Sequence, residues 1–139
     1  MPRVVADNDL CTGCLSCQLF CSAEHIGGFN PKRARLFIHR DAKIAMNTVT
    51  ICRQCGKPPC KTACDRNAIN YNELHILSIN REKCDGCAAC IDACPFDAVK
   101  LDHTNPTALM CDLCTHRGAI DPQCVKACVV NALTLKGVG

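Results

Sequence analysis

The sequence of 139 residues is poor in the large aromatic side chains that usually fill a hydrophobic core. It contains no Trp, one Tyr and four Phe. Side chains of this kind normally supply much of the buried area that stabilises a small domain. Something other than aromatic packing must therefore help to hold the chain together. Bound metal can do so, because metal–ligand bonds that the unfolded chain lacks count directly as folding free energy.

The sequence also lacks a long apolar segment. No stretch approaches the roughly 20 apolar residues that a membrane-spanning helix needs. Its start, MPRVVADNDLC, has neither an apolar stretch of signal-peptide length nor a twin-arginine pair. We therefore expect a cytoplasmic protein. In a reducing cytoplasm, clustered cysteines bind metal more often than they form disulfides.

Motifs for substrate chemistry are missing as well. The sequence contains no P-loop, no G-x-G-x-x-G fingerprint and no G-x-S-x-G nucleophile turn. No stripe of basic residues interleaved with aromatics favours nucleic-acid binding. We therefore expect that the isolated chain is not an enzyme and does not bind nucleic acid.

Against these absences stand sixteen cysteines, which form four groups of four with none left over. The groups are CTGCLSCQLFC (Cys11, Cys14, Cys17, Cys21), CRQCGKPPCKTAC (Cys52, Cys55, Cys60, Cys64), CDGCAACIDACP (Cys84, Cys87, Cys90, Cys94) and CDLCTHRGAIDPQCVKAC (Cys111, Cys114, Cys124, Cys128). Groups one and three follow C-x2-C-x2-C-x3-C, and Pro95 completes the bacterial ferredoxin form in group three. Group four carries an additional loop, residues 115–123, between two of its cysteines.

This spacing suits iron–sulfur clusters. Two residues between cysteines form a tight loop that aims consecutive sulfurs at neighbouring irons. Gly13 and Gly86 each precede the second cysteine of their group, where glycine tolerates the positive φ of such a turn. The three-residue step then places the last cysteine on a helical turn, and in two-cluster ferredoxins that cysteine ligates the other cluster. We therefore expect four [4Fe–4S] clusters, held through iron by all sixteen cysteines.

Two other uses of the cysteines stay open at this point. Four zinc sites with four cysteine ligands each would use the same sixteen thiolates, although zinc ribbons usually bring two well-separated pairs together. Disulfides would not explain the repeated spacing. The charge also depends on the metal: the formal net charge is +3 with neutral cysteines. Four oxidised clusters of about −2 each would bring it to about −5.

An internal repeat follows three of the groups. Four residues after their last cysteine comes alanine with an aliphatic neighbour, which opens the extended stretches AINYN, AVKLD and ALTLK. The segment AINYNELHILSIN reads as two strands around a turn, and RLFIH with NTVTI as a hairpin between groups one and two. The pattern predicts a small, loop-rich α+β fold with two ferredoxin-like halves.

With all four groups in view, the sequence resembles the four-cluster ferredoxin-like electron-transfer subunits of molybdenum and tungsten oxidoreductases, over about residues 9–135. The resemblance rests on C-x2-C-x4-C-x3-C with Pro58-Pro59 before Cys60, and on the long gap that ends in PQCV at residues 122–125. The stretch FNPKRAR looks like the compact members, such as the small subunit of tungsten aldehyde oxidoreductase. Where the family often has proline after the last cysteine, this chain has Ser22, Asp65 and Val129.

The resemblance, rather than the spacing, implies how the groups pair. It implies one polyferredoxin domain over residues 1–139, with one half made of 1–50 plus 100–139 (groups one and four) and the other of 51–99 (groups two and three). The implied ligand sets, named sites A to D, are Cys11, Cys14, Cys17 and Cys128 (A); Cys21, Cys111, Cys114 and Cys124 (B); Cys52, Cys55, Cys60 and Cys94 (C); and Cys64, Cys84, Cys87 and Cys90 (D).

The resemblance also implies a function. It is that of a subunit relaying single electrons through four [4Fe–4S] clusters between a catalytic oxidoreductase subunit and another redox partner. Candidate partners are molybdenum or tungsten enzymes such as formate dehydrogenase or aldehyde oxidoreductase, hydrogenase or carbon monoxide dehydrogenase systems, and further copies of the chain. The alternatives are a zinc-stabilised interaction module and a cluster-based redox sensor. A sensor would more naturally combine one labile cluster with a DNA-binding element.

Several residues that are not cysteines receive plainer interpretations. His25 is expected in local loop structure, and His116 at the surface or beside a cluster rather than as a replacement ligand. The basic residues Lys32, Arg33, Arg35 and Arg40 would either dock an acidic partner or form a solvated face of the hairpin.

Overall fold

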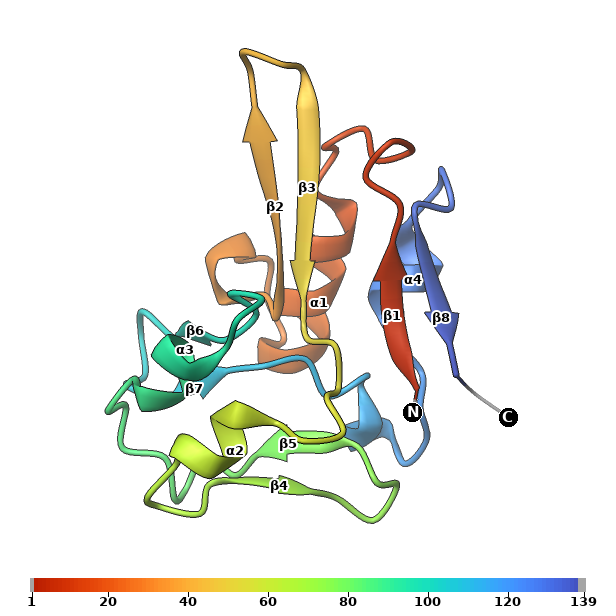
Figure 1. The fold of residues 1–139 in the computed structure, drawn as a ribbon. Helices are drawn as coiled ribbons and strands as arrows, with labels where there is room; N and C mark the ends of the chain where they lie inside the picture. Colours follow the sequence, from red (N-terminus) through yellow and green to blue (C-terminus); the bar gives the residue numbers. More distant parts are fainter. Residues whose placement is uncertain (1, 138–139) are drawn as a thin grey trace.

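The structure, a computed structural model, describes residues 2–137. Within this range the strands pair two by two into separate antiparallel sheets (Figure 1). The pairs are β1 (Arg3–Ala6) with β8 (Leu133–Lys136), β2 (Leu36–Asp41) with β3 (Met46–Ile51), β4 (Ile69–Tyr71) with β5 (Leu77–Ile79), and β6 (Lys100–Leu101) with β7 (Ala108–Leu109). The small, loop-rich α+β class predicted from the sequence is confirmed.

Four short α-helices accompany these sheets in the described range. They are α1 (Ser16–Ile26), α2 (Pro59–Ala63), α3 (Ala89–Ala93) and α4 (Gln123–Ala127), with 3-10 turns η1 (Pro31–Arg33) and η2 (Thr115–Arg117). Helix α1 packs against α4, and α2 packs against α3. In the described part of the chain no helix combines the length and apolar character needed to cross a bilayer.

The strands predicted from the sequence are present, and two further strands were not predicted. The hairpin β2–β3 and the pair β4–β5 form where expected, and β8 forms within ALTLK. The two further strands are β1 and β7. Strand β1 forms because β8, near the other end of the chain, supplies its hydrogen-bonding partner, which local pattern does not reveal. Strand β7 pairs with the nearby β6, and its two residues are too few to show a strand pattern.

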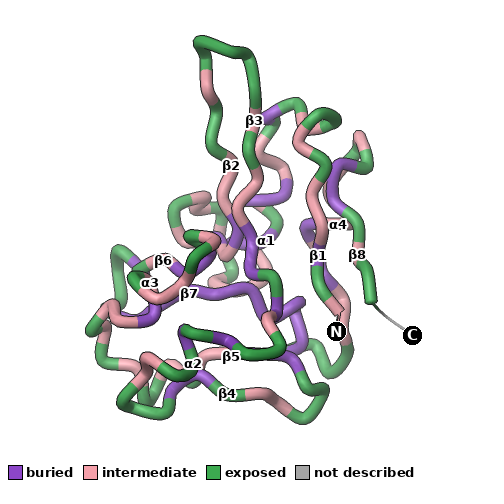
Figure 2. Tube along the Cα trace, viewed as in Figure 1, coloured by how far each residue is buried: buried purple, intermediate pink, exposed green. Residues whose placement is uncertain are grey.

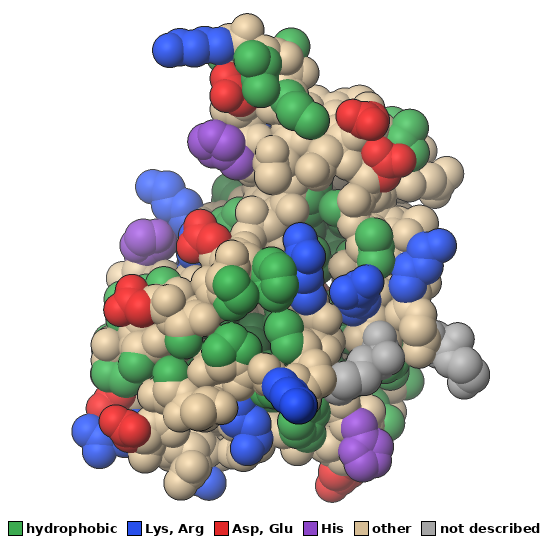
Figure 3. Space-filling view, in the orientation of Figure 1, with side chains coloured by type: hydrophobic (Ala, Val, Ile, Leu, Met, Phe, Trp, Pro, Cys, Tyr) green, Lys and Arg blue, Asp and Glu red, His purple; other side chains and the backbone are tan. Residues whose placement is uncertain are grey.

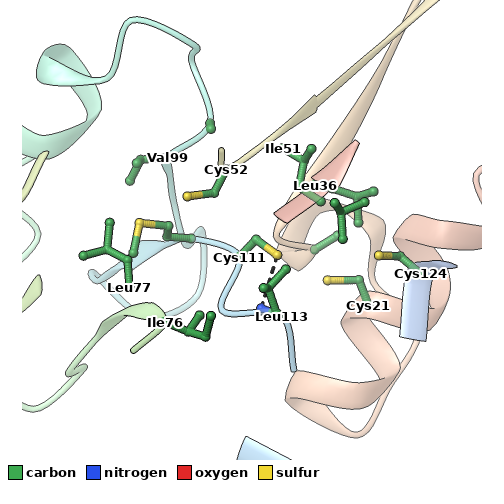
Figure 4. Packing of buried hydrophobic residues seen from close by; sticks show 14 of the residues in the cluster. Cys21, Leu36, Ile51, Cys52, Ile76, Leu77, Val99, Cys111, Leu113 and Cys124 are labelled. Atoms are coloured by element: carbon green, nitrogen blue, oxygen red, sulfur yellow. Dashed lines mark hydrogen bonds between the residues drawn. The ribbon is translucent and has the colours of Figure 1, made fainter. Parts of the chain in front are cut away.

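Cysteines make up much of the buried core. Figure 2 shows buried segments running through the centre of the molecule from the α1 region to the β4–β5 region. Among the aliphatic residues, Leu36, Ile76 and Leu113 are almost completely buried. In the close view of Figure 4, Cys111 lies between Cys52 on one side and the pair Cys21 and Cys124 on the other. The apolar core therefore surrounds a line of thiols rather than a cluster of aromatic rings.

Candidate cluster-binding sites

All sixteen cysteines lie in the described range, and all are free thiols. The disulfide interpretation is therefore wrong. Most of the thiols are buried or half-buried, whereas Cys14 and Cys87 are exposed. Most of the buried cysteines belong to the same core cluster as aliphatic residues from other segments, such as Leu36 and Ile76.

The four C-x2-C turns share one backbone feature. In each, the residue before the second cysteine has a positive φ: Gly13 at 75°, Gln54 at 51°, Gly86 at 77° and Leu113 at 56°. The prediction for the two glycines is confirmed. Positive φ is uncommon outside glycine, so its recurrence at Gln54 and Leu113 indicates that these turns adopt the same shape despite their different sequences. Both residues donate their backbone N–H to the sulfur of the first cysteine, at 3.4 Å and 3.5 Å.

The alanine repeat has a physical reason as well. Each alanine lies four residues after the last cysteine of its group and donates its backbone N–H to that cysteine's sulfur. The pairs are Ala68 with Cys64 (3.4 Å), Ala98 with Cys94 (3.5 Å) and Ala132 with Cys128 (3.2 Å). In group one the corresponding sulfur, Cys21 Sγ, accepts instead from the backbone N–H of Arg35 at 3.2 Å. Such donors stabilise a thiolate and influence the potential of a cluster that it binds.

Two hollows in the structure are each lined by four cysteines. One is lined by Cys11, Cys14, Cys17 and Cys128, which are the four residues of the expected site A. The other is lined by Cys64, Cys84, Cys87 and Cys90, the four residues of the expected site D. Apolar side chains such as Ile38, Val49 and Ile79 complete their walls. The chain thus brings together cysteines from separate groups around a shared space.

The remaining cysteines are also close neighbours. Burial, together with the charges of Cys60, Cys55 and Cys94, raises the pKa of the Cys52 thiol to about 12. These four residues are the cysteines expected in site C.

Site B shows the same behaviour around one of the most deeply buried sulfurs. Burial raises the pKa of Cys124 far above its ordinary value, with further contributions from the charges of Cys21 and Cys114. Burial likewise raises the pKa of Cys111, followed by the charge of Cys124. All four cysteines of this set therefore lie within mutual electrostatic reach.

Charge effects also act between cysteines of different expected sets. The charge of Cys17, in site A, also raises the pKa of Cys124 in site B. The charge of Cys52, in site C, raises the pKa of Cys111 in site B, and that of Cys60 in site C raises the pKa of Cys90 in site D. These charge effects connect A with B, B with C and C with D, and the exposed cysteines, Cys14 and Cys87, belong to the expected sets A and D.

This donor arrangement fits a metal group. Four thiolates so close together, in surroundings that resist charge, are unfavourable unless a cation compensates them. Sets of four cysteine sulfurs are the ligands that [4Fe–4S] clusters use, although zinc accepts the same set. Geometry alone therefore supports thiolate–metal binding, and comparison with other proteins decides which metal.

The sequence model of the 4Fe-4S dicluster domain matches residues 44–137 of this chain. The chain belongs to this family. Relatives of the dicluster-domain protein include the B subunit of tetrathionate reductase from Salmonella typhimurium, 33% identical over 88% of this chain and 52% of its own length. The putative electron transport protein YsaA of Escherichia coli is 32% identical over 94% of this chain and 86% of its own length. The B subunit of polysulfide reductase from Wolinella succinogenes is 31% identical over 94% of this chain and 73% of its own length.

A solved structure shares the fold of this dicluster-domain protein. The active site complex BamBC of benzoyl coenzyme A reductase, in complex with 1,5-dienoyl-CoA, contains a chain with a similar fold. The match covers 100% of the present chain and 78% of that chain. The TM-score is 0.60 at 23% identity. Among the relatives, the chain spans about half the length of the tetrathionate reductase subunit. Family and relatives together identify an iron–sulfur electron-transfer protein, which agrees with a non-catalytic role and disfavours the zinc module.

Of the two histidines, His25 lies differently from the prediction and His116 lies as predicted. His25 is not in a loop: it lies in the last turn of α1 with its side chain 6% exposed, and its Nε2 is 3.8 Å from Oδ1 of Asp112. The helix extends further than the sequence suggested, because Gly27 rather than an earlier residue ends it. His116 lies near the surface, as expected, with its Nε2 3.0 Å from a carboxylate oxygen of Glu24.

The arginines of the segment after α1 bind within the chain. Arg33 donates two hydrogen bonds to Asp102, both at 2.9 Å. Arg35 donates to the carbonyl oxygen of Met110 at 3.3 Å, and Arg40 donates to the carbonyl oxygen of Gly13. Arg33 and Arg35 are only partly exposed, so the fully solvated face is wrong for these two, whereas Arg40 is exposed as that interpretation expects. Docking to an acidic partner stays a prediction. The charges of the three arginines join distant segments.

The loop at 115–123 is fastened to α1 by ion pairs. Arg117 donates to Glu24 at 2.7 Å, and the Asp121 carboxylate is 2.6 Å from the Lys126 ammonium on α4. Pro122 stands at the N-terminus of α4, directly before the turn that carries Cys124. The loop therefore links helix α1, which carries Cys21, to helix α4, which carries Cys124.

Proposed function

We propose that this chain relays single electrons through four [4Fe–4S] clusters arranged in a row, between a catalytic oxidoreductase subunit and a second redox partner. The observation that carries the proposal is that the sixteen free thiols include two sets of four that each line one hollow, and that the exposed cysteines, Cys14 and Cys87, belong to these two sets. Electron tunnelling falls off exponentially with distance, so closely spaced clusters conduct far better than isolated ones. A row with both ends near the surface suits entry at one end and exit at the other.

Sites A to D are the proposed ligand sets. The two cysteine-lined hollows support A and D, and the mutual charge effects among buried thiols support B and C. The packing of α1 on α4 and of α2 on α3 supports the division into halves 1–50 plus 100–139 and 51–99. Bound clusters would supply one-electron redox chemistry, and the chain would position them and limit their contact with water.

The partner is proposed to be a molybdenum or tungsten enzyme in the cytoplasm. Relatives named as parts of tetrathionate reductase and polysulfide reductase support an oxidoreductase partner. The choice of molybdenum or tungsten and of the cytoplasm rests on the sequence alone. The substrate and the direction of electron flow depend on that partner.

Iron and sulfide analysis of the anaerobically purified protein tests the cluster number. We expect about sixteen irons and sixteen sulfides per chain, since each [4Fe–4S] cluster holds four of each. About eight irons would contradict four clusters and agree with the two clusters in the family's name. About four zincs would contradict the proposal altogether.

Pairs of cysteine variants test the ligand sets. Under the proposal, Cys52→Ala with Cys94→Ala affects one cluster, so the double variant loses about four irons. Cys87→Ala with Cys94→Ala affects two clusters and loses about eight. Ala93→Ser, beside a ligand in α3, is the matched control and keeps the full content. If instead the Cys87→Ala, Cys94→Ala variant lost about four irons and the Cys52→Ala, Cys94→Ala variant about eight, Cys94 would share a cluster with Cys87.

A further inference from the structure

A hollow of about 850 Å³ separates strands β1 and β3. Its long sides are β1 and residues 48–51 of β3, and Asn8 lies at one end with Arg53 and Phe96 at the other. Figure 1 shows the two strands side by side and running in opposite directions, each paired on its far side, β1 with β8 and β3 with β2. We call this hollow the β1–β3 slot.

The hydrogen-bonding pattern shows which groups of β3 face the slot. In the β2–β3 register, Val49 lies opposite Ile38. Neither uses its N–H within the hairpin: Ile38 donates to the side chain of Gln18 at 2.8 Å, and Val49 donates across the end of the slot to Asn8 at 3.0 Å. Because hydrogen-bonding direction alternates along a strand, the N–H and C=O of Ile51 face the slot as well.

The same reasoning applies to β1. The N–H of Asp7 donates to the carbonyl oxygen of Ala132, just beyond the end of β8, at 2.7 Å. By alternation, Val5 also points its backbone groups toward β8, and those of Val4 and Ala6 point into the slot. Among the residues that the structure describes, no backbone hydrogen bond joins β1 to β3. Two unpaired strand edges therefore face each other across open space.

One end of the slot is basic. Arg3, Arg53 and Lys136 line an adjoining hollow of about 910 Å³, together with Phe96 and Cys55. All three cationic side chains belong to exposed residues, and within residues 2–137 none of them forms an ion pair. The Arg53 guanidinium stacks 4.0 Å above the Phe96 ring, which holds it at this position. Figure 3 shows Lys and Arg side chains gathered on this face of the molecule.

We propose that the β1–β3 slot binds an extended, acidic segment of a partner polypeptide. The segment adds a strand between β1 and β3 and places carboxylates against Arg3, Arg53 and Lys136. Unpaired strand edges are ready templates for such addition, and main-chain hydrogen bonds then supply the affinity. Because β1 and β3 run in opposite directions, the added strand is parallel to one and antiparallel to the other. The inference goes beyond electron relay and does not depend on which metal the cysteines hold.

Hydrogen exchange on the anaerobic holo-protein tests this proposal. The probes are pools of decapeptides with Val and Thr at alternate positions and two glutamates at either the N-terminal or the C-terminal end. A matched pool carries lysines instead. We expect a glutamate pool to slow exchange of the Val4, Ala6 and Ile51 amides by about tenfold, since these N–H groups become hydrogen-bonded. The amides of Val5 and Thr50 already point to β8 and β2, so they serve as internal controls.

Charge variants and blocked peptides complete the test. Arg53→Gln with Lys136→Gln is expected to weaken binding of the glutamate pool about fivefold, whereas Lys43→Gln in the β2–β3 turn leaves it unchanged. Peptides N-methylated at alternate positions lose binding, because the added strand needs its backbone donors. Iron content, measured in the same variants, stays constant and separates this test from that of the electron relay.

Three results would overturn the proposal. The first is that neither glutamate pool slows the three amides. The second is slowing that appears without peptide and rises with protein concentration, which would assign the slot to a second copy of the chain. The third is equal slowing by free glutamate or phosphate, which would assign the basic end to a small anion.

Discussion

The side-chain amide of Gln54 donates a hydrogen bond of 2.9 Å to the carbonyl oxygen of Cys111, and so joins two cysteine groups that lie far apart in the sequence. The same amide donates to the carbonyl oxygen of Leu77 at 3.3 Å and accepts from its N–H at 2.7 Å. Gln54 is almost completely buried. It therefore connects the turn that carries Cys52 to strand β5 and to the backbone of Cys111.

Replacing Gln54 with leucine is expected to destabilise the folded chain by about 2 kcal/mol, because it leaves buried backbone groups of Leu77 and Cys111 without partners. The measurement is anaerobic denaturant unfolding of the holo-protein. Asn70→Leu, on an exposed amide in β4 that bonds only to Asn67, is the matched control and should change little. An equal loss in both variants would show that the Gln54 bridge contributes nothing specific.

Gly86→Ala is expected to lower stability and cluster content together. Gly86 has φ of 77°, and a Cβ there would lie 2.5 Å from the carbonyl oxygen of Pro106. A positive φ alone costs alanine about 1 kcal/mol, and the backbone clash adds to that. Iron content and unfolding midpoint measure the effect.

Two other glycines separate these causes. Gly27 also has positive φ, at 72°, but a Cβ would meet nothing within 4 Å. Gly28 has open space and no positive φ. We expect Gly28→Ala to be nearly neutral and Gly27→Ala to lie between it and Gly86→Ala. A Gly27→Ala variant as damaged as Gly86→Ala would remove the clash from the explanation.

Asp102→Asn is expected to destabilise the chain by about 3 kcal/mol. The carboxylate is fully buried and lies 2.9 Å from the guanidinium groups of both Arg33 and Arg81. Removing its charge leaves two partly buried cations without compensation. Asp97→Asn, at an exposed ion pair with Lys100, is the control and should have little effect. Unfolding at neutral pH measures both.

The pH dependence of this pair follows from the direction of its shift. Burial raises the pKa of Asp102, but the hydrogen bonds and charge of Arg33 lower it more, so it lies well below its ordinary value. A lowered carboxyl pKa contributes stability that is present above about pH 4 and lost as the pH falls. The Asp102→Asn variant should therefore differ most from the natural chain at neutral pH.

His25 predicts a second pH effect, between pH 6.5 and 4. Burial, and then the charge of Arg35, lowers the pKa of His25 from 6.5 to about 4. The unfolded chain therefore takes up a proton in this window that the folded chain refuses, so stability is full above pH 6.5 and decreases as the pH falls. Anaerobic unfolding rates at pH 7.5 and 5.5 measure this decrease.

Histidine variants identify the group responsible. His25→Gln should reduce the acceleration of unfolding between pH 7.5 and 5.5, whereas His103→Gln, at an exposed histidine, should retain it. An unchanged pH dependence in His25→Gln would assign the effect to another group.

The positions of the local elements could be predicted from the sequence. The C-x2-C spacing and its glycines predicted tight left-handed turns, and the alternating β-branched stretches predicted β2–β3 and β4–β5, because both signals act between residues only a few positions apart. The alanine repeat was visible, but its cause was not. Only the structure shows that each alanine N–H reaches back to a sulfur.

Long-range relationships could not be read in the same way. Arg33, Arg35 and Arg40 looked like an exposed basic patch, and the structure turns each toward a partner elsewhere in the chain. Strand β1 was invisible until β8 supplied its pairing edge. Such contacts depend on how distant segments meet, and no short window of sequence contains both partners.

The sequence by itself determined that sixteen cysteines stand in four groups with the spacing of iron–sulfur ligands, because ligand type and loop spacing are local properties. The two hollows lined by cysteines, the Gln54 bridge and the β1–β3 slot were decided only by tertiary structure. Each requires segments that lie far apart in the sequence to pack against one another, and that packing depends on burial and hydrogen bonding over the whole fold.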